Sequence, residues 1–246
     1  MKKMIVLGAT SAMAEAYTRL VCKKDIELIL ISRDTERMDA LKGDYESRGS
    51  KVIACLELAL DAPHNVLTFI ESNKEVLQGA DMLLTAAGTL PEQGLTEHDT
   101  SYLLQQFNIN GLSIIAFINE FLKQKLNNEQ CTIAAISSVA GDRGRQSNFL
   151  YGSAKSALSI FLEGLMHKYH GSNITIIDVK PGFVDTPMTQ EFNKGVLWAK
   201  PEKIAQIIDN KVQKNKSGVV YAPWFWYWIM FIIRSVPRFV FHKTNL

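Results

Sequence analysis

The chain lacks the features that mark several classes of protein. Its three cysteines, Cys22, Cys55 and Cys131, have neither the pairing nor the spacing that a disulfide framework or a metal site needs. A net charge of +2 over 246 residues gives no basis for a nucleic-acid partner. The sequence also has no internal repeat, low-complexity segment or flexible linker. These absences predict one globular domain in a reducing compartment, with no metal site and no nucleic-acid surface.

Neither end of the chain has a hydrophobic run long enough to cross a bilayer. The start, Met1 to Leu7, superficially resembles a signal peptide, but its apolar stretch is shorter than the usual hydrophobic region. A strand followed by a tight turn explains it better. We therefore expect a cytoplasmic protein.

Short apolar runs alternate with longer amphipathic stretches from the first residues onward. The runs read as strands buried on both faces, and the stretches between them as helices. The expected strands are 4–7, 27–31, 52–56, 82–86, 132–136 and 174–179. The expected helices are 12–22, 35–48, 65–77, 101–126 and 151–169. This alternation predicts an α/β fold: a Rossmann-like, doubly wound parallel sheet with helices on both faces, over residues 1–221.

Tyr151 and Lys155 have the spacing of a proton-transfer pair. Residues four apart share one face of a helix, so the Lys155 ammonium is expected near the Tyr151 phenol, where it would lower the pKa of that phenol. Ser138 follows the apolar run 131–136, which places its hydroxyl at a strand end facing a cleft. The three residues together predict an acid-base site.

The turn after the first strand predicts a nucleotide site. Gly8 and the small residues Ala12 and Ala14 allow backbone N–H groups and a helix N-terminus to approach a pyrophosphate. Thr10 and Ser11 supply hydroxyls beside them. An ordinary strand-helix turn is the simpler alternative.

Ser32 and Arg33 follow the second strand, where NAD-specific sites have an acidic residue for the ribose 2′-OH. An arginine suits a 2′-phosphate, so the pair predicts NADP(H) over NAD(H). The alternative is a solvated Arg33 followed by Asp34 as a helix N-cap.

Two further segments complete the expected nucleotide site. Glu57 and Leu58 follow the third strand and are expected to cover the adenine, with Asp61 as a competing choice. After the fourth strand, residues 85–88 are small where the backbone must run beside the cofactor.

These residues together resemble the short-chain dehydrogenase/reductase family over residues 4 to 190. The family pattern is matched by Gly8-x-x-x-Ala12-x-Ala14, Thr85-Ala86-Ala87-Gly88, Asn110, Ser138, Tyr151-x-x-x-Lys155 and Pro181-Gly182-Phe183-Val184-Asp185-Thr186. The resemblance implies an NAD(P)-dependent oxidoreductase acting on a carbonyl or alcohol, and a homodimer or homotetramer.

The resemblance also assigns roles. Tyr151 is expected to protonate the carbonyl oxygen that Ser138 binds, and Lys155 to hold the nicotinamide ribose. Asn110 is expected to support a proton relay through water. The remaining cofactor contacts are expected from Gly8, Thr10, Ser11, Ala12, Met13, Ser32, Arg33, Glu57, Leu58, Ala86, Ala87, Gly88, Pro181, Gly182, Val184 and Thr186.

Two departures from the family pattern leave alternatives open. The phosphate turn lacks its second and third glycines, and Thr85 and Ala86 replace two asparagines. A non-catalytic nucleotide-binding scaffold or sensor, docked at a membrane, is therefore a second hypothesis. A sugar epimerase or dehydratase also uses Tyr-x-x-x-Lys, but such chains are usually longer.

A closer likeness points to a bacterial branch of the family that includes decaprenylphosphoryl-2-keto-ribose reductase. It is carried by residues 137–148, 180–188 and 223–226. It implies a keto group on a sugar or lipid-linked sugar. Asp142, Arg143 and Arg145 are expected either to meet a phosphorylated substrate or to pair with one another.

The C-terminal segment, residues 222–246, departs from the alternation. Helical spacing puts Arg234, Arg238 and His242 on one side. A broad apolar face is expected opposite, from Phe225, Ile229, Ile232, Ile233, Val236 and Val240. Such a segment is typical of contact with the inner membrane surface through 224–243. An oligomer interface, a lid over the substrate and plain core are the alternatives.

Overall fold

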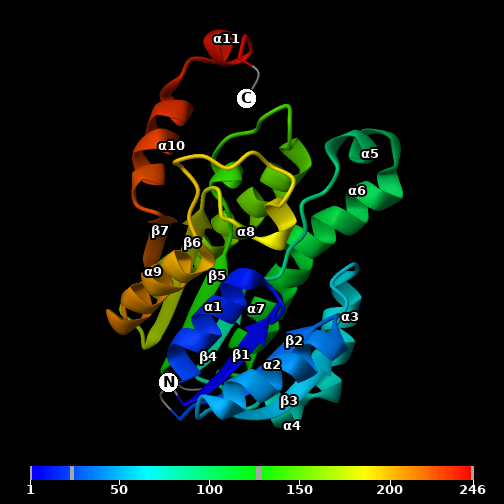
Figure 1. Ribbon diagram of the computed structural model, residues 1–246, viewed down its shortest axis with the longest axis vertical. Helices are drawn as coiled ribbons and strands as arrows, with labels where there is room; N and C mark the ends of the chain where they lie inside the picture. Colours follow the sequence, from blue (N-terminus) through cyan, green and yellow to red (C-terminus); the bar gives the residue numbers. More distant parts are fainter. Residues whose placement is uncertain (1, 23–24, 126–128, 245–246) are drawn as a thin grey trace.

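A parallel seven-stranded sheet forms the centre of the protein in the computed structural model, which describes residues 2–22, 25–125 and 129–244 (Figure 1). The strand order is β3-β2-β1-β4-β5-β6-β7. The strands are β1 (Lys3–Leu7), β2 (Glu27–Ser32), β3 (Lys51–Glu57), β4 (Met82–Thr85), β5 (Cys131–Ile136), β6 (Ile174–Pro181) and β7 (Gly218–Ala222). Strand β7 was not predicted, because it lies at the sheet edge and only its last residue is buried.

Successive residues of each strand point to opposite faces of the sheet, so the molecule has two cores. In β1, Met4 and Val6 belong to one core, and Ile5 and Leu7 to the other. The first core is covered by α1 (Ala12–Val21), α2 (Thr35–Ser47) and α9 (Pro201–Gln213). The second is covered by α3 (Pro63–Ser72), α7 (Ser113–Lys123) and α8 (Phe149–Lys168). The predicted Rossmann-like, doubly wound sheet is confirmed.

Two predicted helices are interrupted. The stretch 101–126 consists of α6 (Thr100–Phe107), a π-helical turn (Asn108–Leu112) and α7, and its predicted end at Leu126 lies outside the described residues. The stretch 65–77 divides into α3 and α4 (Lys74–Leu77). A short helix, α5 (Gln93–His98), precedes α6, and 3₁₀ turns occupy Val139–Asp142 and Pro187–Thr189. π-helical turns are frequent at functional sites, and this one holds Asn110.

The C-terminal segment forms α10 (Phe225–Ser235) and α11 (Arg238–Phe241), at the top of the molecule in Figure 1. Trp226 and Met230 of α10 are buried against Val139, so this side of the helix belongs to the domain. None of the helices in the described ranges is long and apolar enough to cross a membrane.

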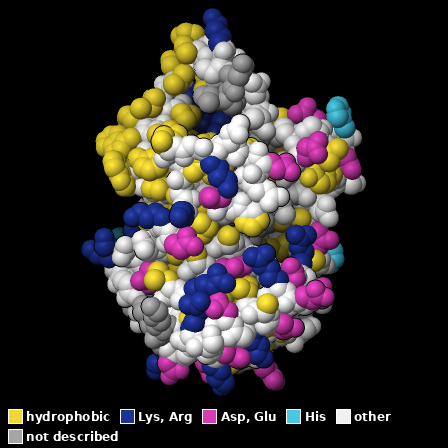
Figure 2. All heavy atoms as spheres, in the orientation of Figure 1, with side chains coloured by type: hydrophobic (Ala, Val, Ile, Leu, Met, Phe, Trp, Pro, Cys, Tyr) yellow, Lys and Arg dark blue, Asp and Glu magenta, His cyan; other side chains and the backbone are white. Residues whose placement is uncertain are grey.

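The outer side of the C-terminal segment is apolar and exposed (Figure 2). The prediction of a single apolar face from helical spacing is wrong, because α10 ends at Ser235 and the chain turns at Pro237 before α11. Of the residues expected on that face, Ile232 and Val240 are exposed. Three others pack inward against the domain: Phe225, Ile229 and Ile233. We call the exposed set the aromatic patch; it consists of Trp224, Tyr227, Trp228, Phe231, Ile232, Phe239 and Val240.

Candidate active site

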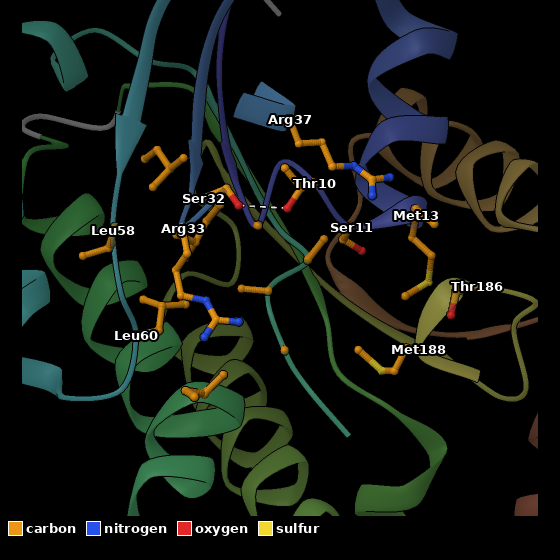
Figure 3. Close-up of a pocket in the computed structure, with 18 of the residues that line it drawn as sticks. Thr10, Ser11, Met13, Ser32, Arg33, Arg37, Leu58, Leu60, Thr186 and Met188 are labelled. Carbon is orange, nitrogen blue, oxygen red and sulfur yellow. Dashed lines mark hydrogen bonds between the residues drawn. The ribbon is translucent and has the colours of Figure 1, made fainter. Parts of the chain in front are cut away.

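A cavity of about 260 Å³ opens at the carboxyl ends of β1, β2 and β4 (Figure 3). It lies where the strand order reverses, since β1 has β2 on one side and β4 on the other. Open parallel sheets bind their ligands at this position. Its lining includes most of the predicted cofactor residues: Gly8, Thr10, Ser11, Ala12, Met13, Ser32, Arg33, Leu58, Ala86, Ala87, Gly88 and Thr186.

The turn before α1 brings the backbone close to this cavity. Gly8 has a φ of 82°, and a Cβ there would lie 2.4 Å from the backbone nitrogen of Ala87. Ser11 is the N-cap residue of α1, and the N–H groups of the first helical turn have no partner within the helix. Ala12 lines the cavity without a bulky side chain. The turn therefore fits a pyrophosphate even without its second and third glycines.

Two hydroxyls and one exposed arginine stand at the β2 side. The Oγ1 of Thr10 and the Oγ of Ser32 are 2.8 Å apart. Figure 3 shows the exposed Arg33 side chain extending along the cavity. Asp34 instead accepts a hydrogen bond from the backbone N–H of Arg37 at 3.0 Å, so it caps α2.

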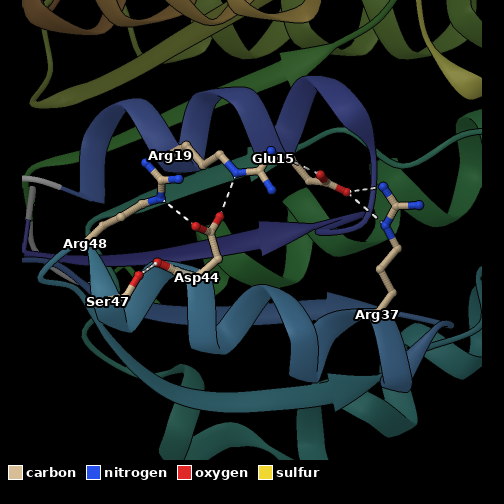
Figure 4. A network of polar contacts seen from close by, with 6 residues as sticks. All are labelled: Glu15, Arg19, Arg37, Asp44, Ser47 and Arg48. Atoms are coloured by element: carbon tan, nitrogen blue, oxygen red, sulfur yellow. Dashed lines mark hydrogen bonds and ion pairs between the residues drawn. The ribbon is translucent and has the colours of Figure 1, made fainter.

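Arg37 is a second cation at this cavity, and the sequence analysis did not single it out. Its guanidinium is paired with the Glu15 carboxylate, in a network that joins α1 to α2 through Arg19 and Asp44 (Figure 4). Arg33 has no ion pair within the described part of the chain. Arg33 is therefore the more available cation for a phosphate.

The third strand contributes differently from the prediction. Glu57 is exposed and lines neither this cavity nor the catalytic one described below, so its predicted contact is not supported by its position. Asp61 hydrogen-bonds Asn65 at 2.9 Å and also lies outside the lining. Leu58 lines the cavity as predicted, with Leu60 beyond it. Residues two apart in an extended chain point to the same side, so the spacing of Leu58 and Leu60 could have indicated that both line the cavity.

A second cavity, of about 320 Å³, continues from the first and shares Ser11, Met13, residues 86–88, Thr186 and Met188 with it. We call it the catalytic pocket. It brings together residues that are far apart in sequence and that the motifs predict: Ser138, Tyr151, Lys155, Pro181, Gly182, Val184 and Thr186.

Ser138, Tyr151 and Lys155 converge on one wall of the catalytic pocket. Ser138 follows β5, and its Oγ accepts a hydrogen bond from the backbone N–H of Ala140 at 3.1 Å. Lys155 is buried, and its Nζ donates to the Ile136 carbonyl at 3.2 Å and lies 5.8 Å from the centroid of the Tyr151 ring. Helix α8 therefore holds the ammonium beneath the phenol.

The electrostatics of this wall differ in one respect from the prediction. Burial raises the pKa of the Tyr151 phenol, and a hydrogen bond with Ser138 opposes that rise. The net shift of the Tyr151 pKa is therefore opposite in direction to the predicted lowering, because the loss of water around a phenolate is the largest effect. Burial also lowers the pKa of Lys155 to about 8, against the attraction of the Asp178 carboxylate. At neutral pH the phenol therefore keeps its proton.

Asn110 lies behind the pocket rather than in its lining. Its Oδ1 accepts from the backbone N–H of Thr89 at 3.0 Å, and its Nδ2 donates to the Gln106 carbonyl at 3.0 Å. A Cβ on Gly88 would lie 3.0 Å from Asn110 Oδ1 and 3.4 Å from Lys155 Nζ. The amide and the ammonium therefore flank one glycine, and Asn110 holds the segment after β4 in place.

Aromatic side chains form the opposite wall. The rings of Phe183 and Trp198 are stacked at 5.3 Å, and Trp226 meets Phe183 edge-on at 5.3 Å. Trp226 comes from α10, so the C-terminal segment contributes to the pocket. The sequence did not show this contact, because nothing in the spacing links residue 226 to residue 183.

The three charged residues of the loop after Ser138 make different contacts. Asp142 accepts from Lys180 Nζ at 2.6 Å and from the Tyr221 hydroxyl at 2.6 Å, so within the described residues it pairs with these two side chains and not with Arg143 or Arg145 as one alternative expected. Arg143 donates to the carbonyls of Ile233 and Val236 and thereby anchors α10. Only Arg145 lines the catalytic pocket.

Comparison with known proteins identifies the family. The family model described as short chain dehydrogenase matches residues 2–197. The chain therefore belongs to the short chain dehydrogenase family, whose members are oxidoreductases that use a nicotinamide cofactor. The predicted family and enzyme class are confirmed at this level.

The individual relatives are distant. An uncharacterized oxidoreductase of Mycobacterium tuberculosis is 28% identical over 158 residues, which is 64% of this chain and 63% of that protein. A 3-oxoacyl-[acyl-carrier-protein] reductase of Bos taurus is 26% identical over 192 residues, or 78% of this chain and 79% of the relative. The match thus spans less than two thirds of the mycobacterial relative.

Solved structures agree with the fold. A short-chain dehydrogenase from Sphingobium yanoikuyae in complex with NADPH superimposes with a TM-score of 0.79, at 17% identity and covering 97% of each chain. The fold is thus shared with this structure over nearly the full length of the chain.

Proposed function

We propose that this protein is an NADPH-dependent carbonyl reductase, or the reverse alcohol dehydrogenase. The observation that carries the proposal is the convergence of Ser138, Tyr151 and Lys155 on a pocket that continues into the nucleotide cavity. A protonated phenol beside a serine hydroxyl suits donation to a carbonyl oxygen.

Each polar group of the catalytic wall has a role. The Ser138 hydroxyl hydrogen-bonds the substrate oxygen, and Tyr151 donates its phenolic proton to that oxygen as negative charge develops on it. Lys155 holds the nicotinamide ribose and keeps a positive charge beneath the phenol. Asn110 fixes the segment at Gly88 and supports the water relay that restores the proton.

The residues around the first cavity fit a dinucleotide. The turn at Gly8 to Met13 would hold its pyrophosphate, and Pro181, Gly182, Val184 and Thr186, which line the catalytic pocket, would hold its nicotinamide. When bound, the reduced nicotinamide supplies the hydride. Arg33 and Ser32 support NADP(H) over NAD(H), because a guanidinium pairs with a 2′-phosphate.

The decisive test is Tyr151→Phe, assayed by NADPH oxidation against a panel of ketones and keto-sugars. We expect turnover to fall by a factor of about 10²–10⁴ while NADPH affinity stays unchanged. Tyr169→Phe, at the end of the same helix, is the matched control and should retain activity. Retained turnover in Tyr151→Phe contradicts the mechanism. Binding of NADPH without turnover of any carbonyl in the wild type favours the alternative of a nucleotide-binding scaffold or sensor.

For the substrate class, we propose a keto group on a sugar or lipid-linked sugar. The support is the resemblance that we infer from the sequence of residues 137–148, 180–188 and 223–226 to the branch containing decaprenylphosphoryl-2-keto-ribose reductase, together with the aromatic side chains of the pocket, which suit an amphiphile. The bovine relative's name points to a competing class, a 3-oxoacyl thioester. Direct comparison of kcat/KM for a keto-sugar and a 3-oxoacyl thioester decides between them.

We also propose that the aromatic patch touches the cytoplasmic face of a membrane, where basic residues of the same segment meet anionic lipid. Trp224 and Phe239 are 72% and 71% exposed. Large exposed apolar patches are rare on soluble monomers, so this exposure supports a binding surface. A homodimer or homotetramer stays a separate prediction. An interface between subunits is the competing role of the aromatic patch.

A further inference from the structure

A third cavity lies between the loop after Ser138 and the C-terminal helices. It measures about 920 Å³ and is walled by residues 142–146 and Phe149 on one side and by residues 234–238, Phe241, His242 and Thr244 on the other. We call it the basic cavity; basic side chains are visible in the hollow below α11 (Figure 2). It shares no lining residue with the nucleotide cavity.

Positive charge dominates this cavity. Its walls hold the four arginines Arg143, Arg145, Arg234 and Arg238, and His242. The structure gives none of the four an ion pair with a carboxylate in the described ranges. Among the described residues of the wall, the one carboxylate is that of Asp142, which already accepts from Lys180 and Tyr221.

Arg145 is the cation with the least compensation. Its Nε is buried and has no hydrogen-bond partner in the described structure. Burial lowers the pKa of this guanidinium, which reflects the cost of removing water from an unpaired charge. An anion beside it would offset that cost, and a guanidinium binds phosphate oxygens through two parallel hydrogen bonds.

The basic cavity and the catalytic pocket are neighbours. Arg145 lines both of them, so one side chain stands between the two spaces. Arg143 holds the far wall in place through the Val236 carbonyl at 2.8 Å, and its guanidinium carbon lies 3.8 Å from the centroid of the Phe241 ring. The loop after Ser138 and the C-terminal helices therefore form one assembled wall around both sites.

We propose that the basic cavity binds a phosphate or diphosphate group of the substrate, while the substrate carbonyl lies at Ser138 and Tyr151. This inference rests on the proposed reductase function and adds the substrate's charge. A volume of about 920 Å³ exceeds what a halide or a lone carboxylate fills. The cavity also borders α10 and α11, which carry the aromatic patch, so an apolar tail on the phosphate has a surface to follow.

The first experiment measures phosphate binding in the full chain saturated with NADP⁺, which prevents the probe from occupying the cofactor site. Inorganic pyrophosphate and dodecyl phosphate are titrated by calorimetry at low ionic strength. We expect both to bind, and the double variant Arg234→Gln/Arg238→Gln to weaken each by about tenfold or more. Both side chains are exposed, so the variant should fold.

Arg48→Gln is the matched control, since Arg48 is an exposed arginine at the end of α2 that only pairs with Asp44. It should bind both probes like the wild type. Dodecyl phosphate binding at least tenfold tighter than pyrophosphate identifies a lipid phosphate as the source, whereas equal affinities identify a free phosphorylated substrate. Absence of binding by either probe, or equal loss in Arg48→Gln, overturns the phosphate site.

The second experiment separates this inference from the reductase proposal. Arg234→Gln/Arg238→Gln, whose side chains line the basic cavity and not the catalytic pocket, should leave kcat/KM for a neutral ketone within about twofold and lower kcat/KM for a phosphorylated keto-sugar by about tenfold or more. Unchanged activity of this double variant on both substrates overturns the inference and leaves the reductase assignment intact. Loss of all activity in Tyr151→Phe with unchanged probe binding shows that the phosphate site is a separate feature.

Discussion

The indole of Trp226 lies directly against Gly182. A Cβ at position 182 would be 1.8 Å from Cε2 of that indole, closer than any two such atoms approach. Gly182 belongs to the Pro-Gly motif after β6, and Trp226 to α10. The C-terminal segment thus packs against the catalytic pocket at this glycine. Removal of the C-terminal segment would therefore change the pocket.

We therefore predict that Gly182→Ala destabilises the protein by about 1–3 kcal/mol through overpacking and lowers activity. The free energy of unfolding, measured by urea denaturation, checks this. Gly164→Ala is the control, because nothing lies within 4 Å of a Cβ there and the residue is inside α8. That change should stabilise by about 0.5–1 kcal/mol. A neutral Gly182→Ala would mean that the indole does not rest on this glycine in solution.

Removal of the Arg33 cation should change cofactor choice. Arg33→Ala is expected to weaken NADPH binding by about 1.5–3 kcal/mol, since a charge-assisted hydrogen bond to the 2′-phosphate is lost. NADH affinity should stay the same. Titration of reduced-nicotinamide fluorescence measures both. Arg19→Ala, in the α1–α2 network but outside the cavity lining, is the control. Parallel loss of NADH and NADPH binding would speak against a 2′-phosphate contact.

The rate of carbonyl reduction should fall as pH rises through about 8. Lys155 has a pKa lowered to about 8 by burial, so it is charged below that pH and neutral above it. Tyr151 has a raised pKa and keeps its proton over the same range, so the fall would report Lys155. A pH profile of kcat/KM tests this. Lys155→Arg keeps its charge at all these pH values and should show no fall near pH 8, even at a lower rate. A fall that persists in this variant belongs to another group.

The Asp142 carboxylate should be important for stability rather than for substrate binding. Asp142→Asn leaves Lys180, which is 9% exposed, without its 2.6 Å partner and with only Asp178 at 3.9 Å. We expect a loss of about 3 kcal/mol in the free energy of unfolding. Glu27→Gln, which breaks the exposed pair with Lys51, should cost at most about 1 kcal/mol. Wild-type stability with a raised KM would restore the substrate role.

Charge on the aromatic patch should abolish membrane contact without affecting catalysis. Trp228→Glu/Phe231→Glu changes two side chains that are each 56% exposed and is expected to prevent co-sedimentation with anionic phospholipid vesicles. Leu67→Glu, at 52% exposure on α3, is the control. If the wild type ignores vesicles and the double variant instead lowers the molar mass in solution, the patch is an oligomer interface.

The sequence alone determined six of the seven strands of the central sheet and the positions of the catalytic motifs. Apolar runs buried on both faces identify parallel strands, because helices cover both sides of such a sheet. Strand ends then place Gly8, Ser138 and the segment at Gly88 at one edge, and helical spacing places Tyr151 beside Lys155. These features follow from local periodicity and connectivity.

Only the tertiary structure decided which side chains reach the cavities. Glu57 was predicted to contact the cofactor and Asp142 to contact substrate or an arginine, yet the first faces solvent and the second is paired with Lys180. Trp226 lies more than forty residues after Gly182 in the sequence, yet its indole packs against that glycine in the pocket. No spacing rule predicts such a contact, because it depends on how the two segments fit together. Burial also reversed the expected pKa shift of Tyr151. Such outcomes depend on packing and on desolvation, which arise only when distant segments meet.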